Sequence, residues 1–118
     1  MAYSTVYQKS KYSSKTCEYK GSIYHSRKEA AYAQELDFRL KAKEFKKWER
    51  QIKIDLRLNG EHICNYYMDF VITHHDGSKE FVEVKGFATE VWRLKWKMTE
   101  AYFQKEIRQG KIKLTLVK

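Results

Sequence analysis

The chain has 118 residues, among them 24 Lys and Arg against 15 Asp and Glu, which gives a formal net charge of +9. This length predicts one domain with a small core, and the positive charge predicts a polyanionic partner, for which nucleic acid is the usual choice. No apolar run approaches the roughly 20 residues of a membrane span, and Cys17 and Cys64 lack the spacing of a zinc site, so we expect a cytoplasmic protein with reduced thiols and no membrane partner.

The first segment, residues 1–15, is polar, basic and rich in Ser and Tyr. It predicts a flexible arm ahead of a single domain that spans residues 16–118. Lys11 and Lys15 in this arm are candidate contacts for DNA phosphates. Two short strand-like runs around Lys20-Gly21 then predict a hairpin.

A first helix is predicted from Ser26 to about Lys43. The sequence Ser-Arg-Lys-Glu fits a capping box, with Ser26 as the N-cap and Glu29 at the third helical position. Glu29 also heads the apolar stripe of the helix, which continues through Ala33, Leu36 and Leu40. Capping and a role in a metal site are two open interpretations of Glu29, and both can hold.

Three strands are predicted next, with turn residues between them. Alternation in "IKIDLRL" marks the first strand, and Asn59-Gly60 is a strong signal for a two-residue hairpin loop. The second strand runs from about His62 to Thr73 and contains "YYMDFVI". After the turn "HHDGS", the segment "KEFVEVKG" gives the third strand.

Charged residues interrupt the second and third strands: Asp69, and then Glu83 with Lys85. Ionised groups inside a small domain are costly unless they are paired or bound to a metal. A two-residue loop between the strands would put the two acids on opposite faces of the sheet. A three-residue loop, His75–Gly77, would instead place Asp69 directly opposite Glu83, and Gly77 suits the left-handed third position. The turn residues permit this second register without excluding the first.

A second helix is predicted after Gly86 by "TEVWRLKWKMTEAYFQKEI", and "KIKLTLV" gives a last strand. The expected buried stripe of this helix contains Val91, Leu94, Met98, Ala101 and Tyr102. Lys95 falls on the same side, so we expect its amine to point inward, toward the charged strand residues. Arg93 and Lys97 have two open interpretations, as phosphate contacts or as part of a solvated face.

The order of the elements is a hairpin followed by α-β-β-β-α-β, which predicts an α/β (α+β) domain with a mixed four-stranded sheet flanked by two helices. If the second register holds, the Asp69 and Glu83 carboxylates repel each other unless a cation lies between them. A hard divalent ion such as Mg²⁺ suits an all-oxygen site that keeps its waters. Lys85, on the same face, would hold an attacking water and stabilise charge on a phosphate.

This arrangement resembles the PD-(D/E)XK nuclease superfamily over the stretch from about Ser26 to Val117. Asp69 and Glu83-Val84-Lys85 match the acid and the (D/E)-x-K of its signature, while Met68 occupies the proline position, which varies within the superfamily. The segments "KYSSKTCEYKGSIYHSRKEAAYAQEL" and "VEVKGFATEVWRLKWKMTEAYF" are similar to a family of small, mostly phage-encoded proteins within that superfamily.

The resemblance implies a restriction-endonuclease-like fold and a Mg²⁺- or Mn²⁺-dependent endonuclease that cleaves DNA in phage recombination or replication, within a bacterial host. It implies that Asp69, Glu83 and the Val84 carbonyl hold the metal. Lys85 would activate the attacking water, and Glu29 would support a water or a second metal. Cleavage would leave 5′-phosphate and 3′-hydroxyl ends. By analogy with small basic members, a Holliday junction is an expected substrate and a homodimer an expected state.

Other functions remain open on the sequence. A non-catalytic nucleic-acid-binding module would have the same charge and fold, although it gives no reason to keep three costly charges. A structural role in phage assembly would require no DNA binding. In either case Asp69 is a satisfied buried acid, and Glu83 with Lys85 is an exposed pair on a strand.

Overall fold

The computed structural model describes residues 16–118, so the predicted arm at residues 1–15, with Lys11 and Lys15, lies outside the described residues. The chain divides into two compact units, and the boundary falls between Glu35 and Leu36. None of the helices in the described part of the chain is long and apolar enough to cross a membrane.

The first unit contains the N-terminal hairpin and the start of a helix. Strands β1 (Cys17–Tyr19) and β2 (Ser22–Tyr24) pair antiparallel, as predicted. Helix α2 spans Arg27–Lys41. The Glu29 N–H donates a hydrogen bond of 3.1 Å to Ser26 Oγ, so Ser26 is the predicted N-cap. Glu29 itself is buried, at the head of the helix.

The second unit is built on a mixed four-stranded sheet in the order β3-β4-β5-β6. β4 pairs antiparallel with both β3 and β5, and β6 runs parallel to β5. The strands are β3 (Lys47–Leu58), β4 (Glu61–Thr73), β5 (Lys79–Val84) and β6 (Ile112–Val117). This sheet, with its helices, confirms the predicted fold class.

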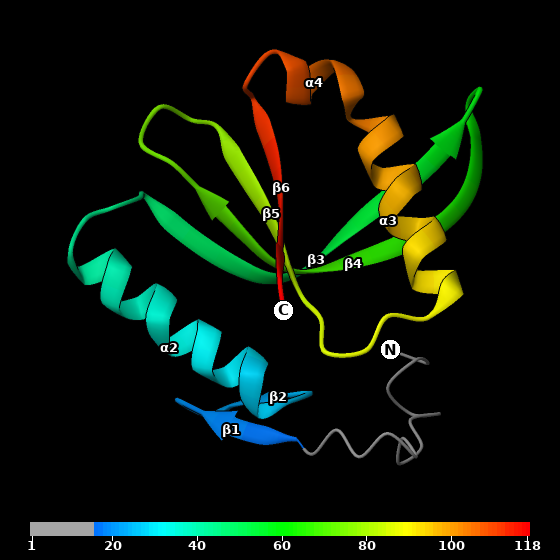
Figure 1. The fold of residues 1–118 in the computed structure, drawn as a ribbon. Coiled ribbons are helices and arrows are strands. Elements are labelled where there is room, and N and C mark those ends of the chain that lie inside the picture. Colours follow the sequence, from blue (N-terminus) through cyan, green and yellow to red (C-terminus); the bar gives the residue numbers. More distant parts are fainter. Residues whose placement is uncertain (1–15) are drawn as a thin grey trace. The chain divides into compact units, whose positions relative to one another are not determined.

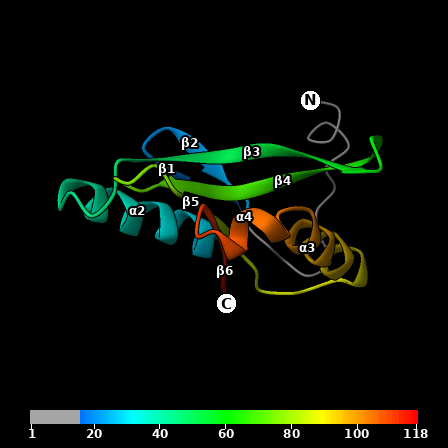
Figure 2. The ribbon, with the colours of Figure 1, turned by 90° about the horizontal axis from the view of Figure 1, so that it is seen from above.

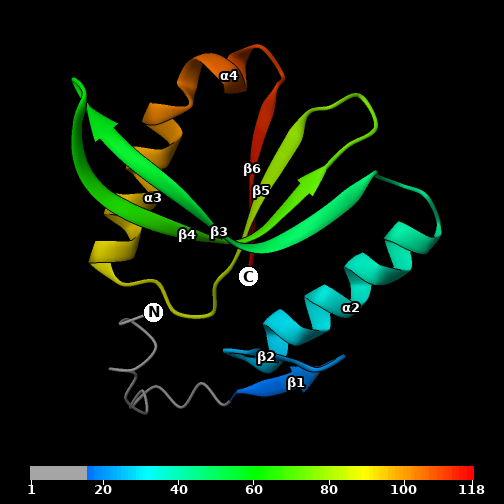
Figure 3. The ribbon, with the colours of Figure 1, turned by 180° about the vertical axis from the view of Figure 1, so that it is seen from behind.

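Helices α3 (Glu90–Tyr102) and α4 (Gln104–Arg108) make the connection that a parallel β5–β6 pair requires. Figures 1 and 2 show both helices on one side of the long β3–β4 hairpin. Figure 3 shows the hairpin from behind, where it passes in front of α3. The sequence predicted one continuous helix here. The structure has two, because Phe103 leaves the helical conformation (φ −101°, ψ 19°).

The predicted stripe of α3 is correct for Met98, which packs against the core, and wrong for Val91, Leu94, Ala101 and Tyr102, which are exposed. Val91 is 64% exposed and Leu94 is 61% exposed. Besides Met98, the aromatic side chains Trp92 and Trp96 of the helix and Phe103 directly after it pack on the core. The Trp92 and Trp96 rings stack at 5.5 Å, and Phe103 meets Phe81 edge-on at 5.3 Å. Large rings bury more apolar area than Val, Leu and Ala, so the aromatic side of the helix packs against the core.

The core beneath α3 consists of six buried side chains from β3, β4 and β5: Ile54, Leu56, Tyr66, Met68, Val71 and Phe81. Ile112 and Leu114 of β6 pack against it from the edge of the sheet. The predicted alternation of β3 is therefore correct for Ile54 and Leu56, whereas Leu58 at the end of the strand is exposed.

Candidate metal centre

Residues 74–78 connect β4 to β5, and the tip of this connection is the three-residue loop His75–Gly77. The His74 N–H donates to the Ser78 carbonyl at 2.9 Å, which closes the loop, and Gly77 has the left-handed φ of +89°. The strands pair from Thr73 with Lys79 to Phe70 with Val82. The structure therefore has the second of the two registers that the sequence allows.

Asp69 lies where this ladder stops. One further step in the same register sets Asp69 opposite Glu83, so both acids belong to one face of the sheet. In place of a ladder hydrogen bond, the Val84 N–H donates to Asp69 Oδ2 at 2.9 Å. The Asp69 carboxylate is thereby held beside the end of β5.

The ladder is also irregular on the other side of Asp69. Arg50 pairs with Phe70 and Ile52 pairs with Met68, but Gln51, which faces Asp69, is skipped. Gln51 has a φ of +54°, in the left-handed region. A non-glycine residue held there within a strand costs roughly 1–3 kcal/mol, and such strain is concentrated at functional sites. Asp69 thus occupies a break in the sheet on both sides.

Glu83 is deeply buried and has a raised pKa. It is only 4% exposed, and its Oε1 accepts no hydrogen bond from the described residues. Its Oε2 lies 3.5 Å from Lys85 Nζ. Burial and the neighbouring Asp69 charge raise the pKa of Glu83 to about 7, against the opposing effects of the Lys85 ammonium and the Tyr66 hydroxyl.

Two aromatic residues complete the surroundings of this pair. Trp92 Nε1 donates to the Tyr66 hydroxyl at 2.7 Å, and the Lys85 ammonium lies 5.1 Å from the centre of the Trp92 ring. Burial, and the nearby charge of Glu83, raise the pKa of Tyr66, so it remains a neutral phenol. The start of α3 therefore fixes Lys85 by a cation–π contact.

The sequence did not assign Tyr66 to the site, and the reason is geometric. Residues three apart in a regular strand point to opposite faces, so Tyr66 and Asp69 should be separated by the sheet. In the structure, however, the Tyr66 hydroxyl interacts with Glu83. Trp92 was identifiable as one of two tryptophans spaced by one helical turn, but its position over Lys85 depends on the helix rotation that the sequence misassigned.

The remaining candidate residues among those described are Glu29 in the first unit and three cationic residues on α3. Glu29 belongs to the first unit, so its part in a metal site stays a prediction. On α3, Arg93 and Lys97 are exposed and Lys95 is half-buried. Among residues 16–118, no contact is described that joins the Lys95 amine to Asp69 or Glu83, and no three His, Cys, Asp or Glu side chains are grouped as metal ligands.

Comparison with known proteins adds one relationship. No curated protein and no solved structure matches the chain significantly. A family model does match, over residues 9–116, and its description is "Protein of unknown function (DUF1064)". Because this match covers nearly the whole chain, the protein belongs to the DUF1064 family.

Proposed function

We propose that this protein is a metal-dependent nuclease that hydrolyses phosphodiester bonds in DNA. The observation that carries the proposal is the pair of acids at the break in the sheet. Asp69 and Glu83 approach from neighbouring strands, and the Glu83 Oε1 is buried without a hydrogen-bond donor among the described residues. A buried, unsatisfied carboxylate oxygen costs free energy, which a ligand of the right charge would recover.

A divalent cation fits this pair. The charge of Asp69 raises the pKa of Glu83, and a cation between the two carboxylates would remove that repulsion. The oxygens of Asp69, Glu83 and the Val84 carbonyl would hold Mg²⁺ or Mn²⁺, both of which prefer oxygen ligands. When bound, the ion would act as a Lewis acid on a phosphate and lower the pKa of water.

Lys85 supplies the positive charge of the site. Its ammonium lies beside Glu83 and against the Trp92 ring, so its position is fixed before a substrate arrives. Such a preorganised cation stabilises negative charge as it develops on a phosphate oxygen. It also offers donors that orient a water molecule for attack.

The charge distribution supports DNA as the substrate. The chain has a net charge of +9, and Arg93 and Lys97 are exposed on α3, the helix that begins beside Lys85. We extend the proposal to an endonuclease of phage recombination or replication in a bacterial cytoplasm. Branched DNA would be its substrate and a homodimer its working form, with Glu29 supporting a water or a second metal.

Cleavage assays test this proposal. Purified protein is incubated with linear, circular, flapped and four-way DNA in Mg²⁺, Mn²⁺ or chelator. We expect metal-dependent products, and a loss of about 100-fold or more in rate for Glu83→Gln and Lys85→Ala. Glu61→Gln, an exposed position on β4, is the matched control and should cleave normally. Equal cleavage by Glu83→Gln and wild-type protein would exclude this site.

A non-catalytic nucleic-acid-binding module is the second candidate. It is supported by the net charge of +9, which would serve DNA binding with or without cleavage. The same assay separates the two functions. A module of this kind would retain the DNA but leave it intact with every metal.

A further inference from the structure

Tyr66 of β4 is a buried side chain that is fixed at both ends. It is only 5% exposed and lies where β4 pairs regularly with β3. Its ring meets the Trp96 ring edge-on, with 6.5 Å between the ring centres. Its hydroxyl oxygen accepts a hydrogen bond of 2.7 Å from Trp92 Nε1. Packing and this hydrogen bond together hold the phenol in one position.

The direction of the Tyr66 proton follows from its contact with Trp92. An indole N–H can only donate, so the Tyr66 oxygen is the acceptor in that contact and its proton is left for another group. The Tyr66 hydroxyl also interacts with Glu83. An ionised carboxylate can only accept, so Tyr66 is the donor in this second contact.

Two polar neighbours therefore orient the Glu83 carboxylate. Lys85 Nζ lies 3.5 Å from Glu83 Oε2, and the Tyr66 hydroxyl is the second group. The other oxygen, Oε1, is buried and accepts no hydrogen bond from the described residues. A metal-ligating carboxylate that is oriented by such neighbours keeps its geometry when the ion binds. Glu83 would thus present one oxygen, rather than both, to an ion.

Trp92 connects the two neighbours of Glu83 to each other. Its N–H donates to the Tyr66 hydroxyl, and the Lys85 ammonium lies 5.1 Å from the centre of its ring. The start of α3 places the indole, because the Trp92 backbone N–H donates to Thr89 Oγ1, the N-cap, at 3.0 Å. One side chain of α3 therefore contacts both groups that orient the carboxylate.

We propose that Tyr66 is a positioning residue that makes the metal centre select Mg²⁺ or Mn²⁺ over Ca²⁺. It holds Glu83 so that only Oε1 is offered to the ion. Mg²⁺ requires a nearly ideal octahedral set of single oxygens, whereas Ca²⁺ accepts about six to eight ligands and takes both oxygens of a carboxylate readily. The inference rests on the proposed function, because it takes Glu83 as a ligand, and it adds the residue that determines which ion is bound.

Metal binding in the absence of DNA tests this role. Electron paramagnetic resonance of free Mn²⁺ gives the Mn²⁺ affinity, and displacement of Mn²⁺ gives the Ca²⁺ affinity. Tyr66→Phe removes only the hydroxyl, and it should weaken Mn²⁺ binding about ten-fold but Ca²⁺ binding less than about two-fold. The matched control, Tyr67→Phe, removes the same group from the next residue, which lies on the other face of β4. It should leave both affinities unchanged.

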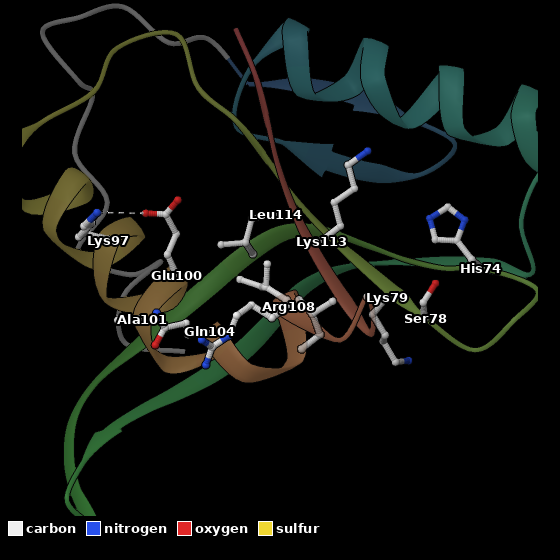
Figure 4. A pocket seen from close by; sticks show the side chains of 13 residues that line it. His74, Ser78, Lys79, Lys97, Glu100, Ala101, Gln104, Arg108, Lys113 and Leu114 are labelled. Carbon is white, nitrogen blue, oxygen red and sulfur yellow. Dashed lines mark ion pairs between the residues drawn. The ribbon is translucent and has the colours of Figure 1, made fainter.

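Two further variants identify where the ion binds. Figure 4 shows Glu100 beside Lys97, 3.9 Å away, at a pocket of about 830 Å³ that neither Asp69 nor Glu83 lines. Glu83→Gln should lose Mn²⁺ binding, and Glu100→Gln should retain it. Equal Mn²⁺ binding by Glu83→Gln and wild-type protein would overturn both the inference and the proposed metal centre.

The ratio of the two affinities separates positioning from a merely structural role. A less stable fold would weaken Mn²⁺ and Ca²⁺ binding by the same factor, because both ions bind the same folded state. Equal weakening in Tyr66→Phe would therefore overturn the inference. Trp92→Phe keeps a ring near Lys85 but removes the N–H that holds Tyr66, so it should lower the ratio in the same direction. An unchanged ratio in both variants would also overturn the inference.

Cleavage assays distinguish this role from the proposed function itself. A protein that shows the change in ion selectivity but never cleaves DNA would refute the nuclease and keep the role of Tyr66. A Tyr66→Phe variant that cleaves DNA and binds both ions as the wild type does would keep the nuclease and overturn the role of Tyr66.

Discussion

Glu83 makes the stability of the protein depend on pH. Its pKa is about 7 in the folded state, against an ordinary value of 4.5, so the folded state binds the proton more tightly. Its contribution to the free energy of unfolding is therefore complete below about pH 4.5 and is lost as the pH rises through 7. At roughly 1.4 kcal/mol per pKa unit, the loss is on the order of 3 kcal/mol at most.

Thermal melts in chelator measure this effect. We expect the wild-type melting temperature to fall between about pH 5 and pH 8, and the Glu83→Gln variant to lack most of that fall. Added Mg²⁺ should restore the wild-type melting temperature at the higher pH, because a ligand of the folded state stabilises it. An identical pH profile for the variant would assign the dependence to other groups.

At the level of the elements, the loop after β4 fixes the register. Gly77 has a φ of +89°, and an added Cβ would meet no atom within 4 Å, so Gly77→Ala would introduce backbone strain without a clash. We expect this change to reduce the free energy of unfolding by roughly 1–2 kcal/mol in urea denaturation. Gly86→Ala, without positive φ and in equally open space, should cost much less. If Gly77→Ala and Gly86→Ala reduce the free energy of unfolding equally, the loop does not hold residue 77 in the left-handed conformation.

Strand β3 contains the opposite case. Gln51 has a side chain, yet its φ lies in the left-handed region that favours glycine. Gln51→Gly removes a left-handed non-glycine residue, so the strain that it relieves offsets the entropy that glycine loses on folding. Lys53→Gly, two residues along the same strand, gains no such relief. We expect the second variant to be less stable than the first by about 1 kcal/mol. If Gln51→Gly proves the less stable variant in urea denaturation, the backbone at Gln51, opposite Asp69, is not strained.

The loops, strands and helices differ in how well the sequence predicted them. Short-range chemistry was sufficient for the two hairpin loops, because Asn59-Gly60 and Gly77 supply the required backbone angles. It also identified Asp69 and Glu83 as a possible pair. The rotation of α3 was not predictable, because the helix has an aliphatic and an aromatic side and only the shape of the sheet selects between them. The break in the ladder at Gln51 and the proximity of Tyr66 to Glu83 have no signature in the residue types.

For the whole molecule, the charge of +9 predicts DNA affinity that falls steeply with salt, since each neutralised phosphate releases counterions. Arg93→Ala should lower the slope of log affinity against log salt by about one, and Lys11→Ala or Lys15→Ala should do the same if the arm contacts DNA. Turnover at saturating DNA should change little for the arm variants. Filter binding across a salt series measures the slopes, and an unchanged slope for Arg93→Ala would place the DNA on another face.

The mixed sheet also has a consequence for the order of folding. β4 and β5 are joined by only five residues, whereas β6 pairs with β5 only after α3 and α4 have been traversed. Closing a short loop costs less chain entropy than closing a long one. We therefore expect Asp69 and Glu83 to be brought together early, before β6 is added. In stopped-flow refolding, Val71→Ala should slow folding, while Leu114→Ala should mainly speed unfolding. The reverse pattern would mean that the crossover forms first and that the acids meet last.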